Sequence, residues 1–304
     1  MRPSYLHRLT LRQVEIYLAV CRLRSYSRAA EELMLTQPAV STQVRQLEQL
    51  VGEPLLNYVG KRVYLTPAGE LLESAARDLQ QRLVTVEMEL AELQGMVQGT
   101  LNIAAESSAQ YFLPGVFADF CSQHPAVDLQ LEVVNHATAL RRVADNRDEF
   151  VIMGLVPDDR ALTFVPFREN RLIAVASPTG AIAAIDSLTI HELANETLLV
   201  REPGSGTRRT FEQYCLDQRL RFAKTRQLGS LEAVKAGVVA GLGVAVLPAD
   251  ACRHELALNI LVELPVQGFP LRRSWCALYP RGKHLTPVGQ RFLKHLLSPQ
   301  QDGG

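Results

Sequence analysis

Apolar and polar positions alternate at helical spacing over residues 26–51, and this stretch organises the N-terminal part of the chain. A first short helix is expected here, with an alanine-rich inner side and Ser27 as its N-cap. Thr36 is the expected N-cap of a second helix, and Pro38 falls in its first turn, where a missing N–H is tolerated. The apolar face of this second helix comprises Val40, Val44, Leu47 and Leu50.

The opposite face of the second helix is polar and carries no acidic residue before Glu48. In helix pairs that read the major groove of DNA, small residues such as alanine typically lie where the two helices cross. The N-terminal half of the second helix is typically polar and lacks acidic residues. An ordinary amphipathic helical hairpin is the alternative that the pattern leaves open. The polar positions are Gln37, Ser41, Thr42, Gln43 and Arg45.

Two further elements follow before residue 98. Residues 55–66 predict a short β-hairpin whose tip holds Gly60, Lys61 and Arg62. A basic tip beside a recognition helix suits a phosphate or minor-groove contact, and a solvated basic turn is the alternative. From Pro67 to about Val97 apolar residues recur in steps of four and three, which predicts a dimerising coiled-coil helix. The expected seam is Leu72, Ala76, Leu79, Leu83, Val86, Leu90, Leu93 and Val97.

Residues 98–304 change to alternating strands and helices, which predicts a parallel α/β architecture in two similar halves. The expected strands are 100–105, 127–134, 150–155, 165–167, 172–177, 197–200 and 243–248. Helices are expected at about 109–121, through Leu140 and Val143, from Thr189, and at 210–218 and 231–239.

Composition adds little, but the position of the charges is informative. The 304 residues are 47% hydrophobic and 21% charged, and 32 basic residues balance 32 acidic ones. Residues 1–66 hold nine Lys or Arg and five Glu, a net charge of 9 − 5 = +4, which is what phosphates would meet. The five cysteines show no paired spacing, so we expect free, buried thiols.

The sequence gives little support to an enzyme. Its seven histidines form no HExxH motif or close ligand pair, and neither a GxSxG elbow nor a catalytic cysteine context is present. We therefore expect no catalytic residues, no metal site and no cofactor. The N-terminus lacks the apolar core of a signal peptide, and no run of about 18 apolar residues occurs, so a cytoplasmic protein without membrane contact is expected.

The run AAEELMLTQPAVSTQVRQLEQLVGEPLL, continued by KRVYLTPAG, resembles the N-terminal signature of the LysR-type transcriptional regulators. The resemblance implies a winged helix-turn-helix over residues 1–66, a linker and dimerisation helix over 67–97, and an effector-binding domain over 98–304. That domain would resemble periplasmic binding proteins, with one subdomain at about 98–172 and 278–304 and the other at about 173–277.

The resemblance also implies partners and DNA contacts. It implies a dyad-symmetric double-stranded operator, a homodimer that pairs into a tetramer, and contact with RNA polymerase. A solute-binding protein, the remote alternative, would explain the α/β half but not the first hundred residues. The residues expected at DNA are Gln37, Pro38, Ser41, Thr42, Arg45, Lys61 and Arg62.

Two stretches have the chemistry of an anion site in the cleft between the subdomains. Ser107 and Ser108 follow one strand, and REPGSGTR (201–208) follows another, so both precede helices whose N-termini favour anions. Simple helix N-capping by the same hydroxyl groups is the alternative. The expected effector-binding residues, with Asn135 and His136 at the rim, are Ser107, Ser108, Asn135, His136, Glu202, Ser205, Gly206 and Thr207.

Segments such as SAQYFLP, REPGSGTR and GSLEAVKAGVVAGLGVAVLP resemble the CbbR and CmpR branch of the family, whose effectors are small phosphorylated metabolites. The chain departs from that branch at Gln110, His136 and Leu231, where the branch has Lys, Arg and Asn. The branch regulates carbon-fixation genes. Because two of its cations are replaced here, a carboxylate or another weakly charged metabolite of a pathway unrelated to carbon fixation is as well supported as a phosphorylated effector.

Overall fold

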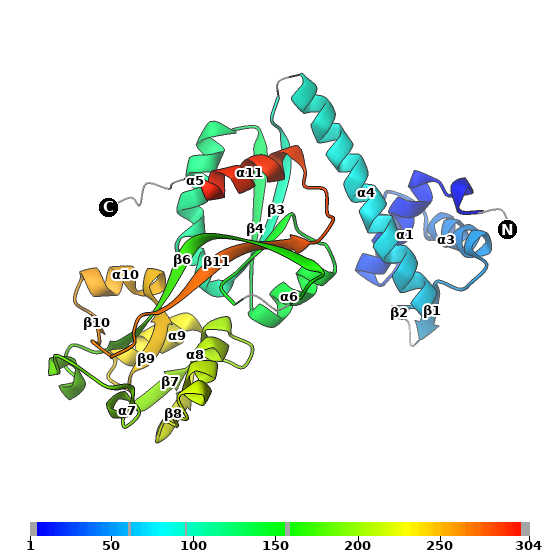
Figure 1. Ribbon diagram of the computed structural model, residues 1–304. Coiled ribbons are helices and arrows are strands. Elements are labelled where there is room, and N and C mark those ends of the chain that lie inside the picture. Colours follow the sequence, from blue (N-terminus) through cyan, green and yellow to red (C-terminus); the bar gives the residue numbers. More distant parts are fainter. Residues whose placement is uncertain (1–4, 60–61, 95, 156–158, 299–304) are drawn as a thin grey trace. The chain divides into compact units, whose positions relative to one another are not determined.

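The computed structural model describes residues 5–59, 62–94, 96–155 and 159–298 (Figure 1). The chain divides into two compact units, Met1–Glu87 and Met88–Gly304. No helix in the described ranges combines the length and apolarity needed to cross a membrane.

The N-terminal unit is a helical bundle with a two-stranded antiparallel hairpin. Ala29 and Ala30 of the first predicted helix are buried in one cluster with Val40 and Val44 of the second. The apolar face predicted from the residue spacing therefore contributes to the core. The elements are η1 (Tyr5–Arg8), α1 (Leu11–Leu23), α2 (Tyr26–Glu32), α3 (Gln37–Val51), β1 (Leu56–Val59), β2 (Arg62–Leu65) and α4 (Pro67–Leu93).

Two predictions for this unit were wrong in detail. Ser25, not Ser27, is the N-cap of α2, because Arg24 turns the chain in the left-handed region (φ 51°) and leaves a link of only two residues after α1. The long helix ends at Leu93 rather than near Val97. The N–H groups of Gln94 and Met96 both donate to the Ala91 carbonyl, which tightens the chain into a turn.

The start of α4 is fastened to the rest of the N-terminal unit by three contacts. The fully buried Tyr17 donates from its hydroxyl to the Gly69 carbonyl at 2.8 Å. Thr66 caps the helix, accepting from Gly69 N at 3.0 Å while donating to the Pro54 carbonyl at 2.7 Å. A Cβ at Gly69 would lie 2.1 Å from the Leu55 carbonyl oxygen, so only glycine allows this approach.

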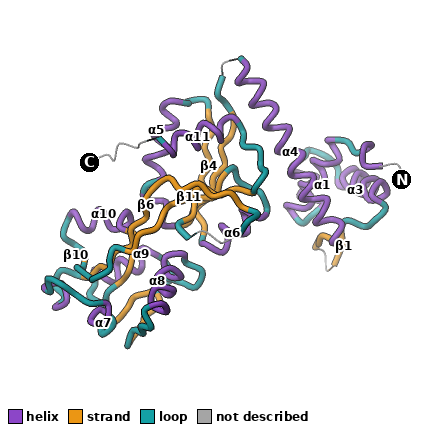
Figure 2. Tube along the Cα trace, in the orientation of Figure 1, coloured by secondary structure: helices purple, strands orange, loops and turns teal. Residues whose placement is uncertain are grey.

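The C-terminal unit is built on one seven-stranded mixed sheet in which two long strands run through both of its halves (Figures 1 and 2). These strands, β6 (Leu162–Ala176) and β11 (Leu271–Pro280), pair antiparallel along the whole of β11. The strand order is β10-β6-β11-β5-β3-β4, with β9 also paired to β6, and a separate parallel pair is β7-β8. The sequence predicted parallel strands, and parallel pairs do occur in both halves. The strands that connect the halves, β6 and β11, are antiparallel.

The first half packs helices on both faces of its strands, with Phe120, Phe150 and Phe292 fully buried in the larger core. Its elements are β3 (Gly99–Glu106), η2 (Ser107–Tyr111), α5 (Leu113–Gln123), β4 (Val127–Val134), α6 (His136–Ala144), β5 (Phe150–Met153) and α11 (Pro287–Leu297).

The second half has two apolar cores, one on each face of its strands. Its elements are η3 (Ala181–Ala184), α7 (Ile190–Leu193), β7 (Thr197–Val200), α8 (Gly206–Asp217), β8 (Lys224–Gln227), α9 (Leu231–Val239), β9 (Ala245–Pro248), α10 (Ala249–Ala257) and β10 (Val262–Glu263).

Two element predictions for this unit need correction. Residues 165–167 and 172–177 were expected as separate strands, yet both lie in or at the end of β6. The strand passes Pro166 because the ladder is irregular there, with Trp275 opposite Arg168 and Cys276 opposite Pro166, so Phe167 is the extra residue of a bulge. The helix expected at 109–121 is divided into η2 and α5, and α8 begins at Gly206 instead of residue 210.

All five cysteines are free thiols, as predicted, but only three of them are buried. Burial raises the pKa of the Cys21 and Cys252 thiols to about 12, so both stay protonated. Cys121 and Cys215 are half-buried.

We expect Gly69→Ala to destabilise the N-terminal unit by about 1–3 kcal/mol, since the added methyl group overpacks the start of α4. Tyr17→Phe removes only the hydroxyl group and its hydrogen bond, and should cost about 1 kcal/mol. Urea unfolding of the full-length protein, followed by circular dichroism, measures both changes.

Gly115 provides a matched control in the first turn of α5. It is exposed, and a Cβ there would meet nothing within 4 Å. Gly115→Ala should therefore stabilise the protein by up to about 1 kcal/mol. A Gly69→Ala protein as stable as wild type would contradict the close approach of α4 to Leu55.

Candidate functional site

The first candidate site is the exposed face of α3. Thr36 caps this helix, its hydroxyl oxygen accepting from Ala39 N at 3.4 Å, and Pro38 lies in the first turn as predicted. Apolar side chains at every third or fourth position fix which face points inward. Among the five α3 residues expected at DNA, Gln37, Pro38, Thr42 and Arg45 are exposed and Ser41 is half-buried.

The polar groups on this face are largely unengaged. Within the described residues, the side chains of Gln37, Thr42 and Arg45 make no hydrogen bond or ion pair, while Ser41 Oγ donates to the Pro38 carbonyl at 3.0 Å. Glu48, the first acidic residue of α3, accepts instead from Leu55 N at 2.9 Å. The helix therefore presents free donors and acceptors, with its acidic group turned toward the hairpin.

The hairpin that follows α3 is the predicted wing. It consists of β1 and β2, which pair from Leu56 with Leu65 to Val59 with Arg62. Arg62 is exposed, and its side chain has no partner among the residues that the structure describes. Lys61, the other predicted contact of the tip, lies outside the described residues.

The second candidate site lies in the C-terminal unit, where β3 of the first half and β7 of the second half end. Ser107 and Ser108 form the start of η2, and Ser205 caps α8, accepting from Arg208 N at 3.4 Å. Ser108, Ser205 and Thr207 are all buried. The predicted strand ends and helix starts are thus real, and hydrogen-bonded contacts join the two sides.

Arg201 links the two halves by a hydrogen bond. This guanidinium group is only 7% exposed, and its Nη2 donates to Ser107 Oγ at 3.0 Å and to Glu202 Oε1 at 2.6 Å. The Nε atom donates to Glu202 Oε2 at 3.2 Å, so the pair is bidentate. The site holds a buried cation whose charge is balanced by the neighbouring carboxylate.

Glu106 is a second buried charged group at the boundary between the halves. Its Oε1 lies 2.6 Å from His136 Nδ1, and its Oε2 accepts from Gly154 N at 2.9 Å. In the second half, a Cβ at Gly206 would lie 2.7 Å from Glu106 Oε1, so the absent side chain lets the α8 N-terminus approach the carboxylate. A carboxylate at a helix N-terminus is electrostatically favourable.

The structure brings four of the eight predicted effector residues together around Arg201 and Glu106. Ser107, Glu202, His136 and Gly206 are joined through Arg201 or Glu106. Asn135 is exposed, and its Oδ1 accepts from Thr138 N at 2.9 Å as the cap of α6. His136 was expected at the rim but is 4% exposed, because it is the first residue of α6 and pairs inward with Glu106.

Sequence reasoning missed Arg201 and Glu106. Both follow directly after an apolar strand run, TLLV in one case and NIAA in the other, and a charged residue at that position was a usable signal. The three departures from the CbbR and CmpR pattern are also placed: Gln110 is exposed, His136 binds Glu106, and Leu231 is buried in a core. The comparison with the CbbR and CmpR pattern considered the two replaced cations but did not include Arg201.

Comparison with known proteins matches two families to successive parts of this chain. Residues 11–70 match the bacterial regulatory helix-turn-helix proteins of the lysR family, and residues 94–300 match the LysR substrate binding domain.

Among curated proteins, the RuBisCO operon transcriptional regulator of Acidithiobacillus ferrooxidans is 42% identical over 97% of this chain and 95% of its own length. The transcriptional activator CmpR of Synechocystis is 35% identical over 95% of each.

Two solved structures illustrate the likeness of fold. The regulatory domain of Synechocystis CcmR, in complex with 2-phosphoglycolate, is 30% identical with a TM-score of 0.64, covering 67% of this chain and 99% of that one. Full-length OxyR of Pseudomonas aeruginosa is 20% identical with a TM-score of 0.74, covering 95% of this chain and 93% of that one. The second likeness concerns the fold alone.

Proposed function

This chain belongs to the LysR family of DNA-binding transcriptional regulators, and from that premise we propose that it controls carbon-metabolism genes in response to a small anionic metabolite. In this proposal residues 1–66 bind DNA, 67–97 dimerise and 98–304 bind the metabolite. It acts in the cytoplasm, where dimers pair into tetramers on the operator and contact RNA polymerase. The observation that carries the proposal is the buried Arg201 guanidinium joining the two halves, in a chain 42% identical to a RuBisCO operon regulator.

Sequence reading is assigned to α3 and affinity to the wing. The exposed amide of Gln37 can form paired hydrogen bonds with a base edge in the major groove. Thr42 can contact a thymine methyl group or a phosphate. Arg62, at the tip of a hairpin, meets the phosphate backbone before it meets bases.

We expect Gln37→Ala to weaken operator binding by about 1–3 kcal/mol and to leave binding to a scrambled duplex unchanged. Arg62→Ala is the matched comparison, because it should weaken both complexes alike and lower the slope of log affinity against log salt by about 0.9. Fluorescence titrations on both duplexes at several salt concentrations measure these effects. Equal losses on the two duplexes for Gln37→Ala would show that this residue does not read sequence.

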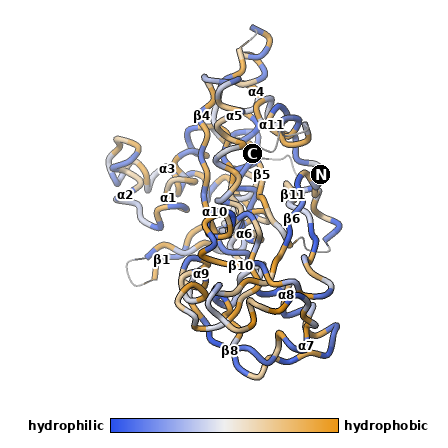
Figure 3. Tube along the Cα trace, turned by 90° about the vertical axis from the view of Figure 1, so that its left-hand side faces the viewer, coloured by the Kyte–Doolittle hydropathy of each residue, from blue (hydrophilic) through white to orange (hydrophobic). Residues whose placement is uncertain are grey.

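Dimerisation is assigned to the apolar seam of α4, along which hydrophobic and hydrophilic positions interleave (Figure 3). The N-terminal part of the seam is already used, since Leu72 and Ala76 pack against the core of the DNA-binding unit. Farther along, the seam residues are exposed in the single chain and would be covered by a second α4. They are Leu79, Leu83, Val86, Leu90 and Leu93.

We expect the double variant Leu83→Glu and Leu90→Glu to sediment as a monomer at concentrations where wild type is a dimer, because charges would replace the apolar seam. Leu71→Glu is the control on the same helix. Leu71 is 75% exposed but lies outside the seam, so its replacement should leave the dimer intact. Wild-type sedimentation of the double variant would mean that another surface dimerises.

Effector binding is assigned to the Arg201 site, with Glu202 as the group that the effector displaces. The carboxylate of Glu202 occupies both the Nη2 and Nε donors of Arg201. Its side chain is 24% exposed, compared with 7% for Arg201, so it can turn toward water without opening the core. A phosphate or carboxylate could take its place on Arg201, held also by Ser107 and the N-terminus of α8.

Such an exchange could switch the regulator only if the anion binds one arrangement of the halves more tightly than the other. Arg201 and the α8 N-terminus belong to the second half, while Ser107 and Glu106 belong to the first. An anion held by both sides would favour their closure, and α4 would carry the change toward the DNA-binding unit.

We expect Glu202→Gln to bind 2-phosphoglycolate on the order of tenfold, or about 1.4 kcal/mol, more tightly, because the competing carboxylate is gone. Arg201→Gln should weaken the same binding by about 2–5 kcal/mol, since the anion loses its cation. Calorimetry on the full-length protein, with glycolate as the ligand that lacks phosphate, measures both.

The control is Glu92→Gln, which removes a carboxylate of the same unit that is paired to Arg291 at 2.7 Å, outside the site. Its affinity should equal that of wild type. Weaker binding by Glu202→Gln would show that Glu202 positions the ligand instead of competing with it. Tighter binding of glycolate than of 2-phosphoglycolate would replace the phosphorylated effector by a carboxylate.

A further inference from the structure

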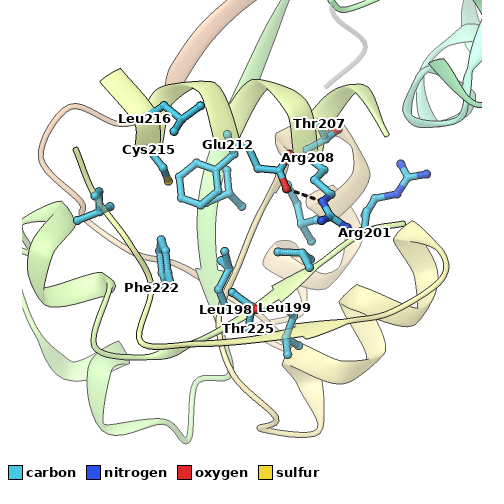
Figure 4. Close-up of a pocket in the computed structure, with 15 residues that line it drawn as sticks. Leu198, Leu199, Arg201, Thr207, Arg208, Glu212, Cys215, Leu216, Phe222 and Thr225 are labelled. Carbon is cyan, nitrogen blue, oxygen red and sulfur yellow. Dashed lines mark hydrogen bonds and ion pairs between the residues drawn. The ribbon is translucent and has the colours of Figure 1, made fainter. Parts of the chain in front are cut away.

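The second half of the C-terminal unit contains a cavity of about 410 Å³ between α8 and the strands β7, β8 and β9 (Figure 4). Folded cores rarely leave voids larger than a water molecule, whereas sites for small ligands begin at roughly 300 Å³. The walls are mostly apolar. Residues that shape them include Leu198, Phe211, Cys215, Leu216, Phe222 and Val246.

The cavity adjoins the Arg201 site, and Arg201 is itself one of the residues that line it. In Figure 4 the side chain of Arg201 extends away from the hollow, consistent with its hydrogen bonds to Ser107 and Glu202 on the other side. Thr207, in the first turn of α8, borders the cavity and also belongs to the predicted effector residues. The cavity and the predicted effector site therefore share residues at the end of β7 and in the first turn of α8.

The polar end of the cavity carries no uncompensated charge. Arg208 Nε donates to Glu212 Oε1 at 2.6 Å, and its Nη1 donates to the Arg201 carbonyl at 2.8 Å and to Gln227 Oε1 at 3.0 Å. The other polar groups of the lining include the hydroxyl groups of Thr207 and Thr225 and the thiol of Cys215. Burial, and secondarily Glu212, raises the pKa of that thiol to about 11. A charged ligand would find no free counter-ion here, whereas a hydroxyl or amide group would find partners.

The apolar end favours a ring or a branched chain. Phe211 and Phe222 meet edge to face with centroids 5.7 Å apart, and both line the cavity. An aromatic ligand can extend this arrangement, which contributes beyond the area it buries. Leu216, which lies on α8 with Phe211, is 69% exposed, so the cavity has an apolar edge that faces solvent.

We propose that this cavity is a second small-molecule site, for an uncharged ligand with an aromatic or branched aliphatic body and one hydroxyl or amide group. Its occupation would be coupled to the Arg201 site through α8, because Arg208 donates to the Arg201 carbonyl and both Arg201 and Thr207 line the cavity. The coupling rests on the proposed effector function, but the binding site itself does not.

Cys215 provides the test, because it lines the cavity and its thiol can be alkylated with N-ethylmaleimide. The probe is 2-phenylethanol, and phenylacetate is its anionic counterpart of similar body. At about ten times its dissociation constant, 2-phenylethanol should slow the alkylation of Cys215 in the full-length protein about tenfold by mass action. Cys121, also half-buried but placed on α5, is the internal control and should not respond.

A filling variant excludes indirect effects. Thr225→Trp introduces a large ring from the exposed strand β8 into the cavity, so alkylation of Cys215 should no longer respond to 2-phenylethanol. Lys224→Trp is the matched control, since residue 224 lies on the same strand but does not line the cavity, and it should retain the response.

The outcomes separate the two parts of the proposal. Unchanged alkylation of Cys215, equal slowing at Cys121, or equal protection by phenylacetate would overturn the site or its preference for uncharged ligands. Calorimetric titration of 2-phosphoglycolate with and without saturating 2-phenylethanol tests the coupling. A changed affinity supports it, and an unchanged affinity alongside protected Cys215 would overturn the coupling while leaving the site in place.

Discussion

The antiparallel pairing of β6 with β11 is the constraint on which the C-terminal unit depends. The ladder runs from Leu271 opposite Leu172 to Pro280 opposite Leu162, and the strands of both halves are added to it. Sliding one half past the other would break this ladder, whereas a twist about its middle keeps the hydrogen bonds. The bulge at Trp275 and Cys276 lies in that middle region, where added local twist is expected. This pairing therefore favours hinge-like motion of the halves over sliding.

The charged groups buried between the two halves are paired within the chain. An isolated buried guanidinium or carboxylate would be strongly unfavourable, but each one here has partners within the chain. Arg201 has Glu202 and Ser107, and Glu106 has His136 and the Gly154 N–H. In the proposed function, effector binding at this site is therefore an exchange of partners, and its free energy is a difference between two satisfied states.

Local signals predicted α3 well, because this helix is short and capped. Thr36, Pro38 and the apolar spacing after them determine α3 without help from distant residues. The failures were those in which tertiary context decided the outcome. Ser25 replaced Ser27 because Arg24 could turn in the left-handed region, and β6 continued past Pro166 because a bulge at Phe167 interrupts its ladder with β11. Arg201 and Glu106 were missed since their importance comes from residues about a hundred or thirty positions away.

The fastening of α4 to the DNA-binding unit has a mechanical consequence. The first turn of α4 is joined to α1 and to the loop before the wing through Tyr17, Thr66 and Gly69, so we expect the helix and the hairpin to move as one rigid body. In a symmetric dimer, a small rotation of this rigid body in each protomer would alter the distance between the two wings and between the two copies of α3. Effector binding would then change the spacing of DNA half-sites that the two recognition helices of a dimer can span on one face of the double helix.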